Sequence, residues 1–367
     1  MSTGRKFFIG LALLTCLLTC LLTYVGLGTP SWRAKASRNP ASELQPVTTP
    51  ALLQSPNIPY MCQHFYQSVC QKLNLHDPTG SVHSDIEGEK MVLQLSQDII
   101  QQHPSWSPEQ INGALVDQIF TPKRRGRIVS SYRWVKNALL KFVDKQPEPI
   151  LNSQEKAFLK NRIQKTKLQL PPPLSLYADE PDLLTKNEAH YERTANGEMR
   201  LRIGGAYVML ARSWFNLVDT FAHELAHSID PCELRAAHFA IPAYDRLTAC
   251  FLKNKFIETR KDRSECVAND QLSEIFADWV AAHLISEALT LYATEFHGAQ
   301  IVNAARNSFR DLCVQDDDPE ELDLTFHPSP QLRIEKIFGY HPGIRQVLGC
   351  QPIEPPLGYC SFEQGSP

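Results

Sequence analysis

The chain contains 367 residues, of which 43% are hydrophobic and 21% are charged. Its 37 Lys and Arg residues nearly balance 40 Asp and Glu residues, and the formal net charge of -3 gives no reason to expect a nucleic-acid partner. After an N-terminal leader and linker, about 300 residues remain, which is enough for one large domain or two lobes.

The first segment predicts a membrane anchor. Arg5 and Lys6 precede residues 7–28, which carry no charge and are rich in leucine. Such a stretch is long enough to cross a bilayer and long for the apolar part of a cleaved signal peptide. The positive charge before it favours a cytoplasmic N-terminus. We therefore predict a signal anchor over 1–28 and a single-pass membrane protein whose remaining chain lies outside the cytoplasm. The alternative is a cleaved leader and a secreted protein.

The anchor is followed by a linker and then by most of the cysteines. Residues 29–58 are rich in Pro, Ser, Thr, Ala and Asn, which predicts a flexible stalk. An even number of cysteines in a translocated domain predicts disulfides, and their spacing is not that of zinc-knuckle pairs. The cysteines beyond the stalk are Cys62, Cys70, Cys232, Cys250, Cys266, Cys313, Cys350 and Cys360.

A helical lobe is predicted over 59–170, beginning with the pair Cys62 and Cys70. No pattern of catalytic residues stands out in this part of the chain. The stretches in which apolar residues recur with helical periodicity are 82–103, 107–120, 128–143 and 153–167.

The pattern changes after a rigid break at Pro171-Pro172-Pro173. Strands are predicted at 174–177, 189–194 and 199–210, and Asn196-Gly197 between the last two is a strong hairpin-turn signal. Gly204-Gly205 would let another backbone come close. That backbone could belong to a peptide laid along the sheet edge, or the two glycines could form a bulge or a simple turn.

The pentapeptide His223-Glu224-Leu225-Ala226-His227 carries the strongest chemical signal. On a helix, two histidines four residues apart leave the same face about one turn apart. Two imidazoles in that relation can hold two corners of a tetrahedral zinc site. Glu224 would then take a proton from a water activated by the metal. The alternative is an amphipathic helix whose two histidines are satisfied by hydrogen bonds.

The residues around this pentapeptide favour a helix. No helix breaker occurs between Trp214 and Asp230, and Asn216 or Asp219 can cap the N-terminus. Apolar side chains also repeat at the spacing of one helix face. These apolar residues are Leu217, Phe221, Leu225 and Ile229.

A second helix, predicted over 272–282, supplies two carboxylates. Glu274 and Asp278 are four residues apart, on one face of an otherwise apolar segment. Carboxylates in apolar surroundings are unfavourable unless they are paired or coordinated. We therefore predict that Glu274 is the third zinc ligand and that Asp278 accepts the outer N–H of a zinc histidine. An exposed helix side, the alternative, does not explain the apolar neighbours.

A histidine and an arginine follow further along the chain, at His327 and Arg333. Near a zinc site, such groups could stabilise a developing oxyanion and hold a substrate carbonyl.

Together these motifs resemble those of the neprilysin family of zinc endopeptidases. In that family the zinc helix reads His-Glu-x-x-His followed by x-Phe-Asp, which corresponds here to His223–Asp230. The second helix carries Glu-x-x-Ala-Asp, matched by Glu274–Asp278, and a later histidine and arginine six residues apart are matched by His327 and Arg333.

The opening of the family's ectodomain, Cys-x-Asp-Phe-x-x-Tyr-x-Cys, is also matched in part. Cys62, Phe65 and Cys70 stand at that spacing, while His64 replaces the acid and Ser68 the tyrosine.

The resemblance covers about 60–70 and 204–360, and it implies a mostly helical α+β fold. A zincin-like catalytic lobe over 171–367 would place a small β-sheet beside the zinc helix. The helical lobe over 59–170 would be reduced, because family members are much longer and their helical domain roofs the catalytic chamber.

The resemblance also implies a role for each residue of the site. The ligands of one Zn²⁺ per chain would be His223, His227 and Glu274. The residues that act in catalysis would be Glu224, His327 and Asp278. The substrate would contact Arg333 and a strand that reads Asn-Ala-Tyr/Phe in the family and Gly205-Ala206-Tyr207 here, where the asparagine is lost.

In the family, the two opening cysteines bridge to the C-terminal part of the ectodomain. A further bridge joins a cysteine between the two zinc helices to the final one. Cys232 and Cys266 have no counterpart in the family and would close a loop between the zinc motifs. The expected bridges are therefore Cys62–Cys350, Cys70–Cys313, Cys250–Cys360 and Cys232–Cys266.

The predicted function is hydrolysis of extracytoplasmic peptides or proteins by a zinc metallopeptidase. Two alternatives remain. The HtpX-like and CaaX-processing membrane peptidases also combine His-Glu-x-x-His, Glu-x-x-Ala-Asp and His-Pro-x-x-x-x-Arg. A neprilysin-like protein could also serve as a binding or scaffold protein with weak catalysis. The partners expected are a peptide or protein substrate and the membrane, with no prediction of oligomeric state.

Overall fold

The chain is described by a computed structural model, and the residues that it describes all fall within the second of its two units, Thr49–Pro367. The anchor predicted at 1–28, nearly all of the stalk predicted at 29–58 and the strand predicted at 174–177 lie outside them. Among the described helices, none is long and apolar enough to cross a membrane. The described residues are 58–70, 81–171, 181–210, 212–256, 271–313, 327–353 and 359–362.

The described part of the chain is mostly helical and contains one small sheet, which confirms the predicted α+β class in its coarse form. The helices predicted in the first half are present. Ser107, Thr121 and Asn152 cap three of them by accepting N–H groups of the first turn. The first half of the chain forms α2 (Ile58–Gln63), α3 (Phe65–Cys70), α4 (Ser81–Gln102), α5 (Pro108–Ile119), α6 (Pro122–Lys145) and α7 (Ser153–Lys165), of which the last four correspond to the predicted stretches.

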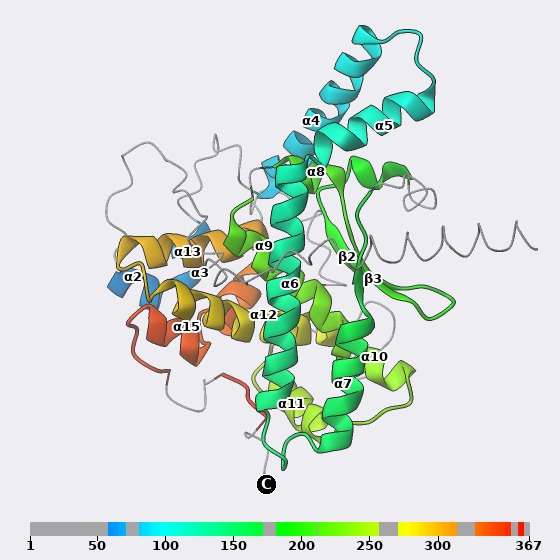
Figure 1. Cartoon of the computed structure of the whole chain (residues 1–367). Helices are drawn as coiled ribbons and strands as arrows, with labels where there is room; N and C mark the ends of the chain where they lie inside the picture. The colour runs from blue at the N-terminus through cyan, green and yellow to red at the C-terminus, as the bar shows by residue number, and fades with distance from the viewer. Residues whose placement is uncertain are drawn as a thin grey trace, which may run out of the picture. The chain divides into compact units, whose positions relative to one another are not determined.

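The sheet has the strand order β1-β3-β2, with β1 (Lys167–Leu168) parallel and β2 (Ala189–Arg193) antiparallel to β3 (Met199–Ile203). The predicted hairpin turn is confirmed, since Gly197 has a φ of 83° in the left-handed region that glycine adopts freely. Strand β2 therefore lies at an edge of the sheet, and Figure 1 shows it beside the central helices.

The strand predicted at 199–210 is only half correct. After Ile203 the chain forms a short helix, α8 (Gly205–Met209), instead of continuing as a strand. A Cβ at Gly204 would lie 2.0 Å from Lys186 O, and one at Gly205 would lie 2.2 Å from Leu184 O. The backbone that comes close to the glycine pair is thus the chain's own, and periodicity alone could not reveal it.

The second half of the chain supplies the remaining helical elements. They are η3 (Pro181–Leu184), α9 (Trp214–Ala226), η4 (His227–Ile229), α10 (Pro231–Ala236), α11 (Pro242–Lys253), α12 (Gln271–Tyr292), α13 (Ala299–Phe309), η5 (Arg310–Leu312), α14 (Pro330–Leu332), the π-helical turn η6 (Arg333–Phe338) and α15 (Pro342–Val347).

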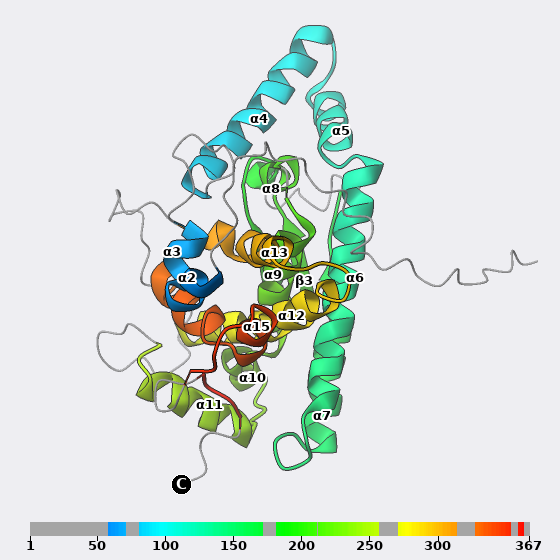
Figure 2. The ribbon, with the colours of Figure 1, turned by 90° about the vertical axis from the view of Figure 1, so that its left-hand side faces the viewer.

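Helix α9 lies at the centre and packs against α6, α12 and α13 (Figures 1 and 2). Its predicted cap is corrected: Ser213 is the N-cap and forms a capping box with Asn216, whereas Asp219 lies inside the helix. The predicted apolar face is buried, and Phe221 meets the ring of Tyr132 from α6 at 6.0 Å. Because a helix with so many buried positions needs neighbours on several sides, α9 is held firmly in place.

Three of the four expected disulfides are confirmed, namely Cys62–Cys350, Cys70–Cys313 and Cys250–Cys360. The first two join residues 288 and 243 positions apart and tie α2 and α3 to the C-terminal part. From the chain entropy that it removes from the unfolded state, each of these two disulfides stabilises the fold by at most about 5 kcal/mol. Cys232 is also disulfide-bonded, but Cys266 lies outside the described residues, so that pairing remains a prediction.

Candidate metal centre

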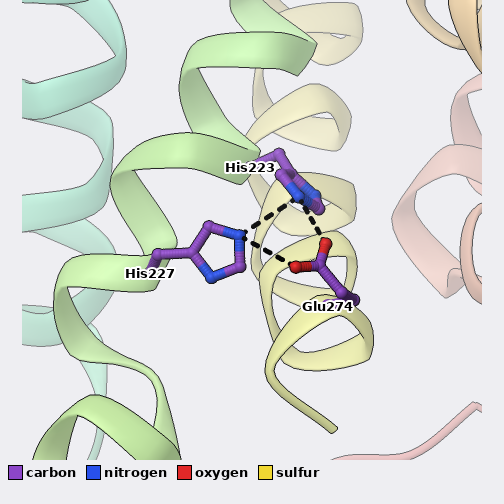
Figure 3. A group of neighbouring side chains, drawn as sticks. All are labelled: His223, His227 and Glu274. Carbon is purple, nitrogen blue, oxygen red and sulfur yellow. Dashed lines mark hydrogen bonds and ion pairs between the residues drawn. The ribbon is translucent and has the colours of Figure 1, made fainter. Parts of the chain in front are cut away.

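Three side chains from two parts of the chain converge on one point (Figure 3). His223 comes from α9, His227 from the start of η4 and Glu274 from the first turn of α12. The two Nε2 atoms are 3.3 Å apart, and Glu274 Oε2 is 3.0 Å from His223 Nε2. One ligand atom from each residue lies within 4.8 Å of the others, an arrangement compatible with a single metal ion.

Helix α9 presents both imidazoles although it ends before the second one. The backbone at His227 keeps right-handed helical angles, φ -57° and ψ -25°, while the hydrogen bonding tightens into a 3₁₀ turn. The ring therefore still projects on the side of His223, and the ring centroids are 4.9 Å apart. The spacing of four residues thus has the geometric effect that the sequence predicted.

The outer nitrogen of His223 is held by a carboxylate. His223 Nδ1 lies 2.8 Å from Asp278 Oδ1, which is where the sequence placed Asp278. Arg333 donates two hydrogen bonds to the same carboxylate, from Nε to Oδ2 at 2.7 Å and from Nη2 to Oδ1 at 2.9 Å. An ionised Asp278 accepts from Nδ1–H, so this geometry leaves the Nε2 lone pair of His223 facing the other ligands.

The outer nitrogen of His227 is held by groups that the sequence analysis did not assign to the site. His227 Nδ1 lies 3.2 Å from Asp230 Oδ2 and 3.1 Å from Ser273 Oγ. Asp230 was noticed only as part of a motif, although its position three residues after His227 places it one turn away. Nothing in the sequence marked Ser273, because its role depends on how α12 docks.

The charges of the cluster compensate one another. Burial opposes protonation of His223, but hydrogen bonds to Asp278 and Glu274 raise its pKa well above the ordinary value. Burial also disfavours the anion of Glu274, but the charge of His227 and the bond to His223 hold its pKa well below the usual range. Burial also disfavours the anion of Asp278, but the charge of Arg333 outweighs this effect and lowers the pKa of Asp278 to about 2. The carboxylates therefore stay ionised near neutral pH and can serve as ligand and anchor.

Glu224 lies next to the first histidine and touches the edge of the sheet. Its Oε2 accepts a hydrogen bond of 2.7 Å from the backbone N–H of Tyr191 in β2. The ring of Tyr191 also lies against His227, with centroids 6.3 Å apart. No sequence signal pointed to Tyr191, since strand β2 reads as an ordinary half-buried strand.

The two downstream residues reach the site in different ways. His327 Nε2 is 3.0 Å from Glu274 Oε2, and its side chain is 49% exposed. Arg333 has an exposed side-chain fraction of 12% and is engaged with Asp278. Both predicted residues therefore stand beside the cluster, with His327 on the open side and Arg333 behind His223.

The segment predicted to be the substrate strand is a short helix. Gly205, Ala206 and Tyr207 are buried in α8 and form no strand. Tyr207 Oη bonds Thr220 Oγ1 at 2.8 Å, and Arg212 stacks over its ring. The expectation that 205–207 forms a strand is therefore wrong, and the strand that contacts Glu224 is β2.

The donor set fits a divalent metal. Two imidazole nitrogens and one carboxylate converge, and each imidazole is oriented through its other nitrogen, as metal-ligating histidines are. The comparisons with known proteins add no family: no protein-family model matches the chain, and no curated protein matches it significantly.

Proposed function

We propose that this chain is a zinc metallopeptidase of the neprilysin-like type. The observation that carries the proposal is the convergence of His223 Nε2, His227 Nε2 and the Glu274 carboxylate (Figure 3). Glu224 directly follows His223 in α9. Two histidines and one glutamate are a recurrent ligand set of catalytic zinc, in which a fourth position stays open. Structural zinc sites, in contrast, use four protein ligands and mostly cysteines.

Each residue has a place in the hydrolysis of a peptide bond. When bound, zinc polarises the scissile carbonyl and makes water acidic enough to serve as nucleophile near neutral pH. Glu224 takes the proton of that water, and the N–H of Tyr191 holds its carboxylate in position. His327, which is half-exposed beside Glu274, supplies a donor to the developing oxyanion.

Arg333 has a supporting part in this scheme. Its Nε and Nη2 are both engaged with Asp278, so it fixes the carboxylate that orients His223. Contact with a substrate carbonyl, expected from the resemblance, would have to use its remaining group, Nη1.

The edge of β2 is the better candidate for holding a peptide substrate. Backbone bonds Gly204 N to Glu188 O and Thr194 N to Glu198 O show that even-numbered residues of β2 pair with β3. The odd-numbered residues, Tyr191 among them, therefore direct their backbone groups away from β3, to a side on which no strand of the described residues pairs with β2. A substrate could add to this edge as a further strand next to Glu224.

The disulfides support an extracytoplasmic location, since such bonds persist in oxidising compartments. They also join the cysteines that the neprilysin resemblance implies, which favours this reading over the HtpX-like one. We propose a single-pass membrane protein that faces the periplasm, a lumen or the exterior, or a secreted protein if the leader is cleaved.

A matched pair of variants tests the proposal. The wild-type chain should bind one zinc and cleave a quenched peptide library. Glu224→Gln should keep its zinc and lose turnover roughly a hundred- to ten-thousand-fold, because general-base assistance is worth that much. Glu274→Gln should instead lose zinc, because a neutral amide is a poor ligand. Absence of zinc from the wild-type chain, or near-normal turnover in Glu224→Gln, would contradict the proposal.

A further inference from the structure

We propose that Ser273 is a positioning residue of the metal site. Its hydroxyl fixes the ring of His227 through Asp230 and couples that ring to the helix that carries Glu274. The inference rests on the proposed zinc site and adds to it a residue outside the recognised motifs.

His227 needs anchoring more than His223 does. His223 lies within α9 and is buried, whereas His227 stands where α9 has ended and a 3₁₀ turn begins. The backbone at His227 thus belongs to a 3₁₀ turn, whose hydrogen bonds have poorer geometry than those of an α-helix. The orientation of its ring depends on what its outer nitrogen meets.

The hydrogen bonds around Asp230 assign the protons. Ser273 Oγ donates to Asp230 Oδ2 at 2.5 Å, and a hydroxyl has one proton to give. It cannot also donate to His227 Nδ1, 3.1 Å away. Nδ1 must therefore carry the proton and donate to Asp230, with Ser273 Oγ as a second acceptor. This tautomer directs the Nε2 lone pair of His227 at the metal position.

Asp230 is held differently from its counterpart Asp278. Arg333 neutralises Asp278 with two charged donors. Apart from His227, the structure describes two donors to Asp230, Ser273 Oγ and the backbone N–H of Glu233. The second bond, of 2.7 Å, caps the N-terminus of α10. With only 2% of its side chain exposed, Asp230 has little access to water, so the loss of Ser273 Oγ leaves one carboxylate oxygen poorly satisfied.

Ser273 also links the ligands supplied by different helices. It directly precedes Glu274 in the first turn of α12, while Asp230 follows the turn that holds His227. One hydroxyl thus sets the distance between the imidazole and the carboxylate that must bind the same ion. Removing it loosens both ligands together.

The test is zinc affinity, measured by competition with a chromophoric chelator on the full chain. Ser273→Ala should weaken zinc binding about tenfold, at the lower end of the ten- to hundredfold range for such supporting partners. Ser273→Val, which has the shape of threonine without the hydroxyl, should weaken it equally, and Ser273→Thr should restore near wild-type affinity. Ser308→Ala, which removes a buried hydroxyl bonded to Ala304 O in α13, should leave the zinc affinity unchanged.

The outcomes separate this inference from the function on which it rests. Equal zinc affinity in Ser273→Thr and Ser273→Val overturns the inference, even if Ser273→Ala fails to fold. Lower unfolding stability with unchanged zinc affinity also overturns it, because the role would then be purely structural. A wild-type chain that binds no zinc removes the proposed function, and the inference falls with it.

Discussion

A pair of histidines away from the metal centre should make the stability of this chain sensitive to mild acid. The backbone N–H of Ile344 donates to His341 Nδ1, which therefore carries no proton. His341 Nε2–H then donates to His283 Nδ1 at 3.2 Å. His283 must carry its own proton on Nε2, a buried atom with no hydrogen-bond partner among the described residues. Both rings are thus held in the neutral form.

The surroundings oppose a charge on either ring. Burial lowers the pKa of His283 to about 3. Burial, with a smaller effect of His283, lowers the pKa of His341 well below its ordinary value. The packing is tight where α15 meets α12, since a Cβ at Gly343 would lie 2.1 Å from Ser286 Oγ. Water has little room to solvate an imidazolium there.

The sign of the pH effect follows from these lowered pKa values. Stability from a neutral histidine is fully present above the unfolded pKa of about 6.5 and is lost as pH falls toward the folded pKa. For His283, with a folded pKa of about 3, proton uptake by the unfolded chain removes about 2 kcal/mol between pH 7 and 5. His341, whose pKa burial also lowers, adds to this loss.

The His341→Asn variant isolates this effect, because asparagine does not titrate and can still cap α15 at Ile344 N. Urea unfolding at pH 7 and pH 5, with chelator present, should show a smaller loss of unfolding free energy in the variant than in the wild-type chain. The control His297→Asn changes an exposed histidine, and its free energy of unfolding should fall between pH 7 and pH 5 by as much as that of the wild-type chain. An equal loss in the wild-type chain and His341→Asn would refute the reasoning.

Three further outcomes test the metal site and the cross-links. Asp278→Asn should weaken zinc affinity or turnover roughly ten- to a hundredfold, because an amide holds the N–H of His223 less firmly; unchanged chelator competition and turnover would deny Asp278 its role. Tyr191→Pro removes an N–H that points away from β3, so it should preserve zinc content and lower kcat relative to the control Tyr191→Ala; equal kcat in the two variants would contradict this. Peptide mapping without reduction should find Cys232 joined to Cys266, and a free thiol at either position would overturn that pairing.

The sequence was sufficient for features whose causes are local. Histidines four residues apart at His223 and His227 share a helix face whatever surrounds them, since the helix repeat alone sets this. The Asn196-Gly197 turn was readable for the same reason, because few other residues accept its backbone angles. Glu274 and Asp278 stood out because carboxylates on an apolar helix face require partners.

Disulfide pairing required more than spacing. Eight cysteines allow about a hundred connectivities, and nothing in their positions selects one of them. A resemblance supplied the expected pairs, and the packing of α2, α3 and α11 brings their cysteines to partners in the last part of the chain. The helix at 205–209 was not predicted either. Its first residues lie against the backbone of Leu184 and Lys186, and this contact exists only in the folded chain.

The supporting contacts of the metal site were decided by tertiary structure alone. Asp230 and Ser273 meet across 43 residues of sequence, and Tyr191 meets Glu224 across 33. Such contacts depend on the angle and depth at which α12 and β2 dock against α9. That docking results from side-chain packing summed over many residues, which no local pattern encodes. The sequence therefore determined which groups could bind a metal, and the packing of the helices determined how their rings and carboxylates are held.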